Sequence, residues 1–177
     1  MTKEVQVIRL GHRIVRDVRM TTHCALVARA FGAKSITICG EEDKEIVAGL
    51  QKTTERWGGP FYITYSPSWQ KSCSVAKRKG FALVHATMYG LPLQKQIKKI
   101  RKLKKITIII GSQKVPGEVY QLADYNVAVT SQPHSEVAAL AILLHEIFQG
   151  KELEKKFCRP KIRIIPTPRG KTVKKLK

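Results

Sequence analysis

The 177-residue sequence is poor in acidic residues and has few cysteines. Its four cysteines, Cys24, Cys39, Cys73 and Cys158, are widely spaced and form no CxxC pair, so the sequence predicts neither a zinc site nor a disulfide framework. No apolar run has the length of a membrane span, and residues 1–9 lack the apolar segment of a signal peptide. We therefore expect a soluble, cytoplasmic protein without a membrane partner.

Signature motifs of several common enzyme classes are also absent. There is no GxxxxGK[ST] phosphate loop and no GxGxxG turn after the first predicted strand, which argues against the usual ATP and dinucleotide sites. There is no HExxH pair, no Cys/His ligand cluster and no GxSxG turn, so metal-dependent and acyl-transfer mechanisms have no candidate site.

The scarcity of acidic residues leaves a large excess of positive charge. Lys and Arg total 33 against 13 Asp and Glu, which gives a formal net charge of +20 and a pI near 10.1. Nucleic acid is the first partner that such an excess suggests. Basic residues concentrate in the predicted helix that begins at Leu93 and in residues 151–177. We expect an RNA-facing surface there, with the last residues mobile, although a solvated helix face would also explain the first cluster.

Short apolar runs alternate with segments of helical spacing over residues 1–150. The predicted strands are 5–10, 35–39, 61–65, 81–86, 106–110 and 126–129, and residues 87–90 are a predicted loop. The predicted helices start at Thr21 or Thr22, then cover 43–57, 68–79, 93–104, a turn after Pro116, and 137–148. The alternation predicts an α/β domain with a mostly parallel sheet flanked by helices. Residues 151–177 form a basic extension with a strand at 161–165, expected to pack on the same domain.

Two polar loops follow the last two predicted strands of this sheet. The strand 106–110 stops at Gly111, and the strand 126–129 leads into residues 130–135. Ser135 is a predicted N-cap of the apolar helix that follows. Because the carboxyl ends of parallel strands meet at one edge of an open sheet, we predict that this loop pair forms the binding site. If both faces of helix 137–148 are buried, part of it must pack beyond its own domain.

Three long segments resemble one known family. They are RLGHRIVRDVRMTTHCALVARAFGA (9–33), GSQKVPGEVYQLADYNVAV (111–129) and SQPHSEVAALAILL (131–144). They are similar to the archaeal tRNA cytidine 2′-O-methyltransferases that modify position fifty-six of the T-loop, a branch of the SPOUT class. The resemblance implies a SPOUT-type fold with a C-terminal trefoil knot, S-adenosylmethionine as cofactor, tRNA as substrate, and a homodimer with a shared active site. The family has Glu where this chain has Gln113, so a charged contact is not expected there.

The same resemblance implies which residues form the site. Catalytic help would come from the segment that holds Arg16, Asp17, Arg19 and His23. The cofactor would lie in loops formed by Leu83, Gly111, Ser112, Gln113, Lys114, Val115, Val129, Thr130, Ser131, Gln132, Pro133, His134, Ser135 and Glu136.

The roles of the catalytic candidates stay open at this level. Arg19 is the first candidate for the arginine that assists deprotonation of the 2′-hydroxyl. Because arginine is protonated at any ordinary pH, it is better suited to stabilise the developing alkoxide, with His23 or a substrate phosphate oxygen as proton acceptor. Asp17 could equally form a local salt bridge with a neighbouring arginine. His134 could contact the ligand or bond the start of its helix, and His145 is expected to be structural.

Two other functions are compatible with the sequence. A SPOUT-class RNA base methyltransferase would need a carboxylate or similar group near the target nitrogen, for which Asp17 is the candidate. A non-catalytic basic RNA-binding protein would have no evident need for two polar loops at strand ends. Binding of S-adenosylmethionine separates the enzymes from the binding protein.

Overall fold

A six-stranded parallel sheet forms the centre of the fold in the computed structural model, which describes residues 3–111 and 114–176. The strands are β1 (Glu4–His12), β2 (Ser35–Gly40), β3 (Tyr62–Ser66), β4 (Ala82–Pro92), β5 (Lys105–Gly111) and β6 (Tyr125–Ala128). Their order is β3-β2-β1-β5-β4-β6, and every neighbouring pair is parallel. The predicted α/β class with a mostly parallel sheet is confirmed.

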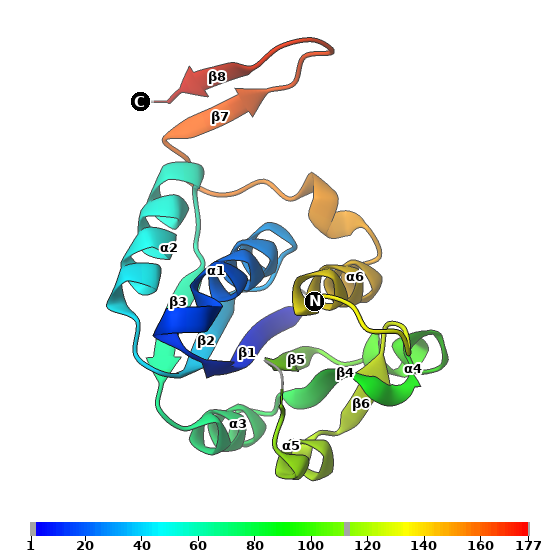
Figure 1. Ribbon diagram of the computed structural model, residues 1–177. Coiled ribbons are helices and arrows are strands. Elements are labelled where there is room, and N and C mark those ends of the chain that lie inside the picture. Colours follow the sequence, from blue (N-terminus) through cyan, green and yellow to red (C-terminus); the bar gives the residue numbers. More distant parts are fainter. Residues whose placement is uncertain (1–2, 112–113, 177) are drawn as a thin grey trace.

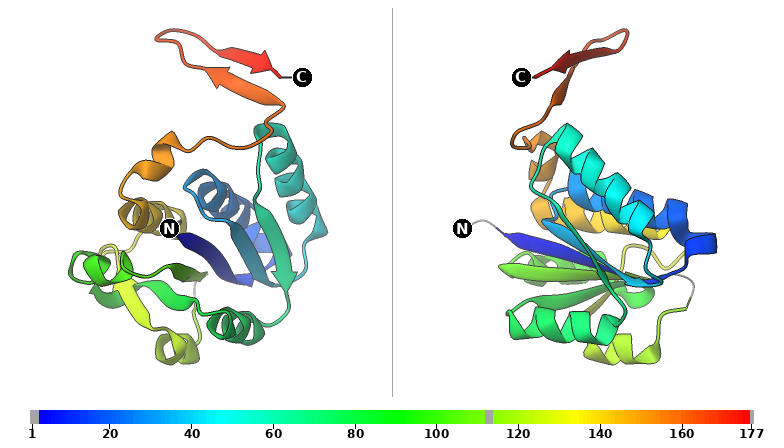
Figure 2. Two further views of the ribbon diagram at one scale, coloured as in Figure 1. Left: turned by 180° about the vertical axis from the view of Figure 1, so that it is seen from behind. Right: turned by 90° about the vertical axis from the view of Figure 1, so that its left-hand side faces the viewer.

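Helices cover both faces of the sheet (Figures 1 and 2). They are α1 (Ile14–Ala30), α2 (Lys44–Trp57), α3 (Trp69–Arg78), α4 (Leu93–Ile100), α5 (Gly117–Leu122) and α6 (Glu136–Phe148). Helices α1, α2, α4 and α6 share one buried apolar cluster, and α3 and α5 contribute to a second. The sheet therefore lies between two helical layers. None of the helices in the described part of the chain is long and apolar enough to span a membrane.

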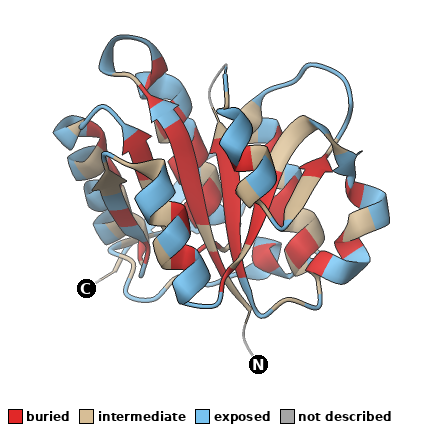
Figure 3. Ribbon diagram, turned by 90° about the horizontal axis from the view of Figure 1, so that it is seen from below, coloured by how far each residue is buried: buried red, intermediate tan, exposed pale blue. Residues whose placement is uncertain are grey.

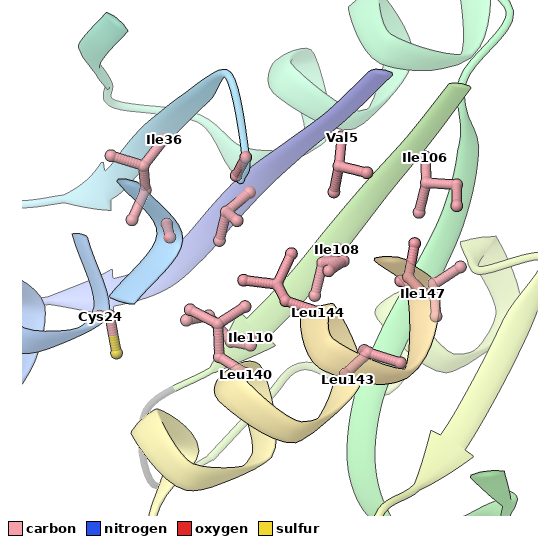
Figure 4. Packing of buried hydrophobic residues seen from close by; sticks show 14 of the residues in the cluster. Val5, Cys24, Ile36, Ile106, Ile108, Ile110, Leu140, Leu143, Leu144 and Ile147 are labelled. Carbon is pink, nitrogen blue, oxygen red and sulfur yellow. The ribbon is translucent and has the colours of Figure 1, made fainter. Parts of the chain in front are cut away.

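The central strands are buried on both faces because each face carries helices (Figure 3). On one face, Ile106, Ile108 and Ile110 of β5 belong to the cluster that includes α6. On the other face, Ile109 belongs to the cluster with α3 and α5. Two-sided burial explains why β5 is a continuous β-branched run and does not alternate with polar residues. Figure 4 shows the inner face of α6, including Leu143, packed over Ile106, Ile108 and Ile110.

The N-terminal end of α1 differs from the prediction. The helix begins at Ile14, and its N-cap residue Arg13 makes no side-chain capping bond. Thr21, one of the two predicted N-caps, is fully buried in the middle of α1, where its hydroxyl contacts Nδ1 of His12 at 2.8 Å. The prediction of a helix start at Thr21 or Thr22 is therefore wrong. The local sequence does not distinguish a threonine that caps a helix from one that bonds a buried partner inside a helix.

Strand β4 is longer than predicted. It continues to Pro92, with an irregular register against β6 between Ala86 and Leu91, so residues 87–90 are extended and not a free loop. At Gly90 a Cβ atom would lie 2.5 Å from the backbone of Asn126 and Val127. A glycine at this position allows the two backbones to approach closely.

The C-terminal extension ends in a hairpin that points away from the sheet (Figure 1). After a short 3₁₀ helix, η1 (Lys151–Glu154), strands β7 (Ile162–Ile165) and β8 (Thr172–Lys175) pair antiparallel. The predicted strand at 161–165 is confirmed, but the expected mobile end is the second strand of a hairpin. Phe157 lies in the segment between η1 and the hairpin, and the centroid of its ring is 4.3 Å from the guanidinium of Arg29 on α1.

The buried face of α4 allows a direct test of the core. Ile100 is fully buried between α4 and the sheet, whereas Lys99 beside it is exposed. We expect Ile100→Ala to lower the free energy of unfolding by about 2–5 kcal/mol, because it removes apolar contacts and leaves a cavity. The matched variant Lys99→Ala should change it by no more than about 0.5 kcal/mol. Urea denaturation followed by circular dichroism measures both, and equal effects would contradict the described packing.

Candidate active site

A cavity of about 470 Å³ opens at the carboxyl-terminal edge of β4, β5 and β6. It is lined by His85, Ala86, Thr87, Met88, Tyr89, Gly111, Val115, Tyr120, Val129, Pro133, His134, Ser135, Glu136 and Ala139. Both predicted polar loops therefore contribute to one pocket, and β4 adds a third side. The meeting of strand ends follows from the parallel sheet, in which all six strands end at the same edge.

The loop between β6 and α6 is fixed by bonds within itself. The Ser135 hydroxyl accepts a hydrogen bond from the Val137 backbone N–H at 3.2 Å, which confirms the predicted N-cap. Nδ1 of His134 lies 2.8 Å from the Gln132 carbonyl oxygen, so it carries the proton that it donates there. His134 therefore presents an unprotonated Nε2 when its ring is neutral. His134 lines the pocket, and its bond goes to the Gln132 carbonyl of its own loop, so contact with a ligand stays a prediction.

The start of α1 reaches the same loops. A second cavity of about 380 Å³ is lined by Arg13, Arg16, Asp17, Met20, Gly111, His134, Ser135 and Glu136, the last four of which also line the first cavity. Asp17 accepts a hydrogen bond from Nε of Arg13 at 2.8 Å. This bond is the main cause that lowers the pKa of Asp17 and keeps the carboxylate charged. A local salt bridge is present at Asp17 as considered, but its partner is Arg13 and not Arg16 or Arg19, between which Asp17 lies in the sequence.

The remaining predicted site residues lie elsewhere. Arg19 and His23 are exposed on α1 and line neither cavity. Leu83 is fully buried in the core near the start of β4. Residues 85–89, further along the same strand, line the pocket instead. Lys114, Thr130, Ser131 and Gln132 are exposed and are not part of either lining. Ser112 and Gln113 lie outside the described residues.

A buried ion pair beside the pocket was not identified in the sequence analysis. Arg9 on β1 is fully buried, and its Nη2 lies 3.0 Å from Oε1 of Glu136 in the first turn of α6. Arg9 and Glu136 belong to segments 127 residues apart, so no local pattern reveals the pair. Burial raises the pKa of Glu136, although the charge of Arg9 opposes that effect. The pair fixes the first turn of α6, and with it the loop that lines the pocket.

His85 is the second functional candidate that the sequence analysis did not place in the site. It is fully buried on β4 and lines the larger cavity, with Nδ1 2.9 Å from Oδ1 of Asn126 on β6. Burial lowers the pKa of His85, which favours the neutral ring. The available signal was a histidine inside an otherwise apolar strand, because a buried polar side chain needs a partner.

A larger hollow of about 720 Å³ lies between α1 and α2 and shares no residue with the two cavities at the sheet edge. Its walls include the apolar side chains of Ile14, Val18 and Leu26. It lacks the converging polar loops of the sheet edge, and the cavities there are the better candidate for chemistry. Within the described part of the chain, no group of His, Cys, Asp or Glu residues could hold a metal ion.

Comparison with known proteins places this arrangement among RNA methyltransferases. A profile described as tRNA ribose 2′-O-methyltransferase matches residues 57–174. Similar proteins named tRNA (cytidine(56)-2′-O)-methyltransferase occur in Pyrococcus horikoshii (51% identity, covering 96% of this chain and 84% of that one). Others occur in Thermococcus kodakarensis (48%, covering 99% of each) and Methanopyrus kandleri (46%, covering 96% of each).

Solved structures of low sequence identity share the fold. An RNA 2′-O ribose methyltransferase has a TM-score of 0.64 at 14% identity, covering 85% of this chain and 58% of that one. The TrmH/SpoU tRNA modifying enzyme of A. aeolicus has a TM-score of 0.62 at 16% identity, covering 86% and 78%. The SpoU methyltransferase AviRb of Streptomyces viridochromogenes, solved in complex with AdoMet, has a TM-score of 0.60 at 16% identity, covering 84% and 58%.

The Arg9–Glu136 pair gives a pH-dependent prediction. Arg9→Met should lower the free energy of unfolding by about 3–5 kcal/mol at neutral pH, because it leaves the Glu136 carboxylate buried without its partner. When the pKa of a carboxyl is higher in the folded state than in the unfolded state, the folded protein loses stability as the pH rises from the unfolded pKa to the folded pKa. The deficit should therefore shrink as the pH falls and Glu136 becomes protonated. Denaturant titrations across pH measure this effect.

Two control variants complete this test. Glu136→Gln in the Arg9→Met background removes the buried charge at nearly constant volume, so it should recover part of the lost stability at neutral pH. Arg13→Met removes a partly exposed partner of Asp17 and should lower the free energy of unfolding far less than Arg9→Met does. A pH-independent deficit in Arg9→Met would contradict the assigned role of the pair.

Proposed function

Because this chain belongs to the family of tRNA ribose 2′-O-methyltransferases that act on cytidine 56, we propose that it performs this methyl transfer in the pocket at the sheet edge. It is an S-adenosylmethionine-dependent tRNA methyltransferase. The observation that carries the proposed location is that three strand ends and the start of α1 meet at two cavities with four residues in common.

The pocket residues fit S-adenosylmethionine. Two buried polar atoms there, Nε2 of His85 and Oε2 of Glu136, have no hydrogen-bond partner among the described residues. A ligand with N–H and O–H groups and a positive charge would satisfy both. At Gly111 a Cβ atom would clash with the side chain of Val115, so the turn after β5 requires glycine. When bound, the cofactor would supply a sulfonium methyl group: its carbon would bond to the ribose 2′-oxygen as the methyl–sulfur bond breaks, the 2′-hydroxyl proton would pass to a base, and S-adenosylhomocysteine would leave.

The chain's own residues bind the substrate and stabilise developing charge in this proposal. Arg16 and Asp17 line the smaller cavity, where Arg16 can hold a phosphate or the 2′-oxygen as it becomes an alkoxide. Arg19 and His23 are on the exposed surface of α1, so in a single subunit they are separate from both cavities. They could act on a substrate only across a subunit interface or on RNA that extends along α1. The base remains either His23 or a phosphate oxygen of the tRNA.

Two basic surfaces are proposed to bind the tRNA. Helix α4, the turn after it and the first residue of β5 expose six lysines, Lys95, Lys98, Lys99, Lys102, Lys104 and Lys105. The β7–β8 hairpin is exposed along its length and carries Arg163, Lys174 and Lys175. Lys and Arg contacts to phosphates release counterions and add affinity that does not depend on sequence. Selection of the T-loop would then depend on tRNA shape and on the 2′-hydroxyl. We place this activity in the cytoplasm.

A homodimer is proposed from the outer faces of α1 and α6. Helix α6 buries its inner face, but Ile142 remains 46% exposed in the single chain, so burial of both faces would require a partner. Met20 on the neighbouring helix α1 is 37% exposed and lines the smaller cavity. A second copy could cover the exposed apolar side chains of α6 and α1 by twofold symmetry.

The trefoil knot implied by the family resemblance is part of the same proposal. The pocket is lined by residues that surround the turn after β5 and by the chain that leads from β6 into α6. In the SPOUT class these segments form the knot, and the cofactor lies in its loops. The fold match to TrmH/SpoU enzymes supports this arrangement.

Activity is tested by incubating the protein with tritiated S-adenosylmethionine and unmodified tRNA transcript, followed by nucleoside mapping. We expect label in 2′-O-methylcytidine from the T-loop. Arg16→Ala should lower kcat by about 100-fold, because it removes a charge that stabilises the alkoxide. Arg78→Ala, at an exposed position of α3, is the matched control and should keep wild-type kcat.

The other possible outcomes of this assay assign the protein differently. Label on a base would indicate a SPOUT base methyltransferase, and no label without cofactor binding would leave an RNA-binding protein. Arg19→Ala in the same assay shows whether Arg19 takes part. A loss with Arg19→Ala alone would move the catalytic arginine to the exposed face of α1 and contradict the role proposed for Arg16.

The dimer is tested by sedimentation velocity. Ile142→Asp places a charge on the exposed face of α6, so it should convert a dimer to a monomer while the melting temperature of the monomer fold changes little. Leu153→Asp is a suitable control, because Leu153 is 66% exposed on η1 and lines neither cavity. A wild-type monomer at micromolar concentration would contradict the proposed dimer.

A further inference from the structure

The buried histidine of the pocket has a defined hydrogen-bonding state. The Asn126 amide nitrogen donates to the Tyr120 backbone carbonyl at 2.8 Å, which fixes the orientation of the amide group. Its oxygen, Oδ1, therefore faces Nδ1 of His85 at 2.9 Å and can only accept. Nδ1 must carry the proton of the neutral ring. The other nitrogen, Nε2, is then an acceptor.

The ring is held in place by more than this bond. The His85 and Tyr120 rings pack edge to face, with centroids 4.7 Å apart and an interplanar angle of 83°. The Tyr120 hydroxyl lies 3.1 Å from Oγ1 of Thr87, and both residues also line the cavity. The chain of contacts Thr87–Tyr120–Asn126–His85 thus joins β4, α5 and β6 on one side of the pocket.

The acceptor at the end of this chain has no partner. Nε2 of His85 is buried and makes no hydrogen bond to any residue in the described ranges 3–111 and 114–176. An unpaired buried acceptor is unfavourable, and such groups in native proteins call for an explanation. The burial that lowers the pKa of His85 also keeps the Nε2 lone pair free at neutral pH. The other titratable side chains lining the cavity are Tyr89, Tyr120, His134 and Glu136.

We propose that His85 is a cofactor-binding residue whose unprotonated Nε2 accepts a hydrogen bond from an N–H or O–H group of bound S-adenosylmethionine. Asn126 is the positioning residue that fixes the ring and its tautomer. The inference rests on the proposed function, because it takes the pocket to be the cofactor site. S-adenosylmethionine has such donors in its amino groups and in its ribose hydroxyls.

The affinity test uses calorimetry with S-adenosylmethionine and with S-adenosylhomocysteine. His85→Leu removes the acceptor, so both ligands should bind about 10- to 100-fold more weakly. His85→Gln keeps an acceptor oxygen near the Nε2 position and should recover most of the affinity. His145→Leu is the matched control, because His145 bonds Glu152 of η1 outside the pocket and should not change the affinity.

Nitrogen-15 spectra of the imidazole groups give a readout that does not depend on how a variant folds. In wild-type protein, His85 should show a protonated Nδ1 and an unprotonated Nε2, and added S-adenosylmethionine should shift the Nε2 resonance. Asn126→Ala should give a mixture of both tautomers and weaker binding. The inference is wrong if Nε2 carries the proton, or if its resonance is unchanged in the cofactor complex.

The outcomes separate the two proposals. Wild-type protein that methylates tRNA while His85→Leu binds the cofactor normally would overturn the role of His85 and leave the methyltransferase intact. Wild-type protein that binds neither S-adenosylmethionine nor S-adenosylhomocysteine would overturn both.

Discussion

The packing of α6 against the central strands is the constraint on which the rest of the site depends. Leu140, Leu143, Leu144 and Ile147 are fully buried against β5 and its neighbours, so the helix has a fixed position over the sheet (Figure 4). The first residue of α6 is Glu136, and its cap is Ser135. Because both line the cavities, the apolar contacts of one helix determine where two polar residues of the pocket lie.

Local signals in the sequence predicted most of the fold. The errors concern contacts that the residues of a single segment do not reveal. The strand β5 and the N-cap Ser135 were predicted correctly, because a β-branched run and a serine before an apolar helix are features of neighbouring residues. The predicted start of α1 was wrong because Thr21 lies inside the helix and its hydroxyl bonds His12 just before it. The β7–β8 hairpin was missed because antiparallel pairing joins Ile164 to Val173 across a polar turn.

The site was predictable to the extent that it depends on strand ends. Gly111 and residues 133–136 converge as the parallel sheet requires, and the family resemblance named them in advance. Arg9 and His85 were not placed in the site, because each is a polar residue inside a strand and its partner lies far away in the sequence. A charged or polar residue in the middle of a buried strand is the one sequence signal that indicates such a site.

The distribution of charge separates two ligands of opposite sign. The protein as a whole carries a formal net charge of +20, and its exposed lysines suit the polyanion tRNA. The cavities contain the carboxylates of Glu136 and Asp17, each held by an arginine, Arg9 and Arg13. S-adenosylmethionine carries a positive sulfonium, which a carboxylate in the pocket would favour, whereas Arg16 on α1 would favour a phosphate of the tRNA. In the proposed function, carboxylates at the sheet edge would therefore let a strongly basic protein accept a cationic cofactor while its exposed lysines bind the tRNA.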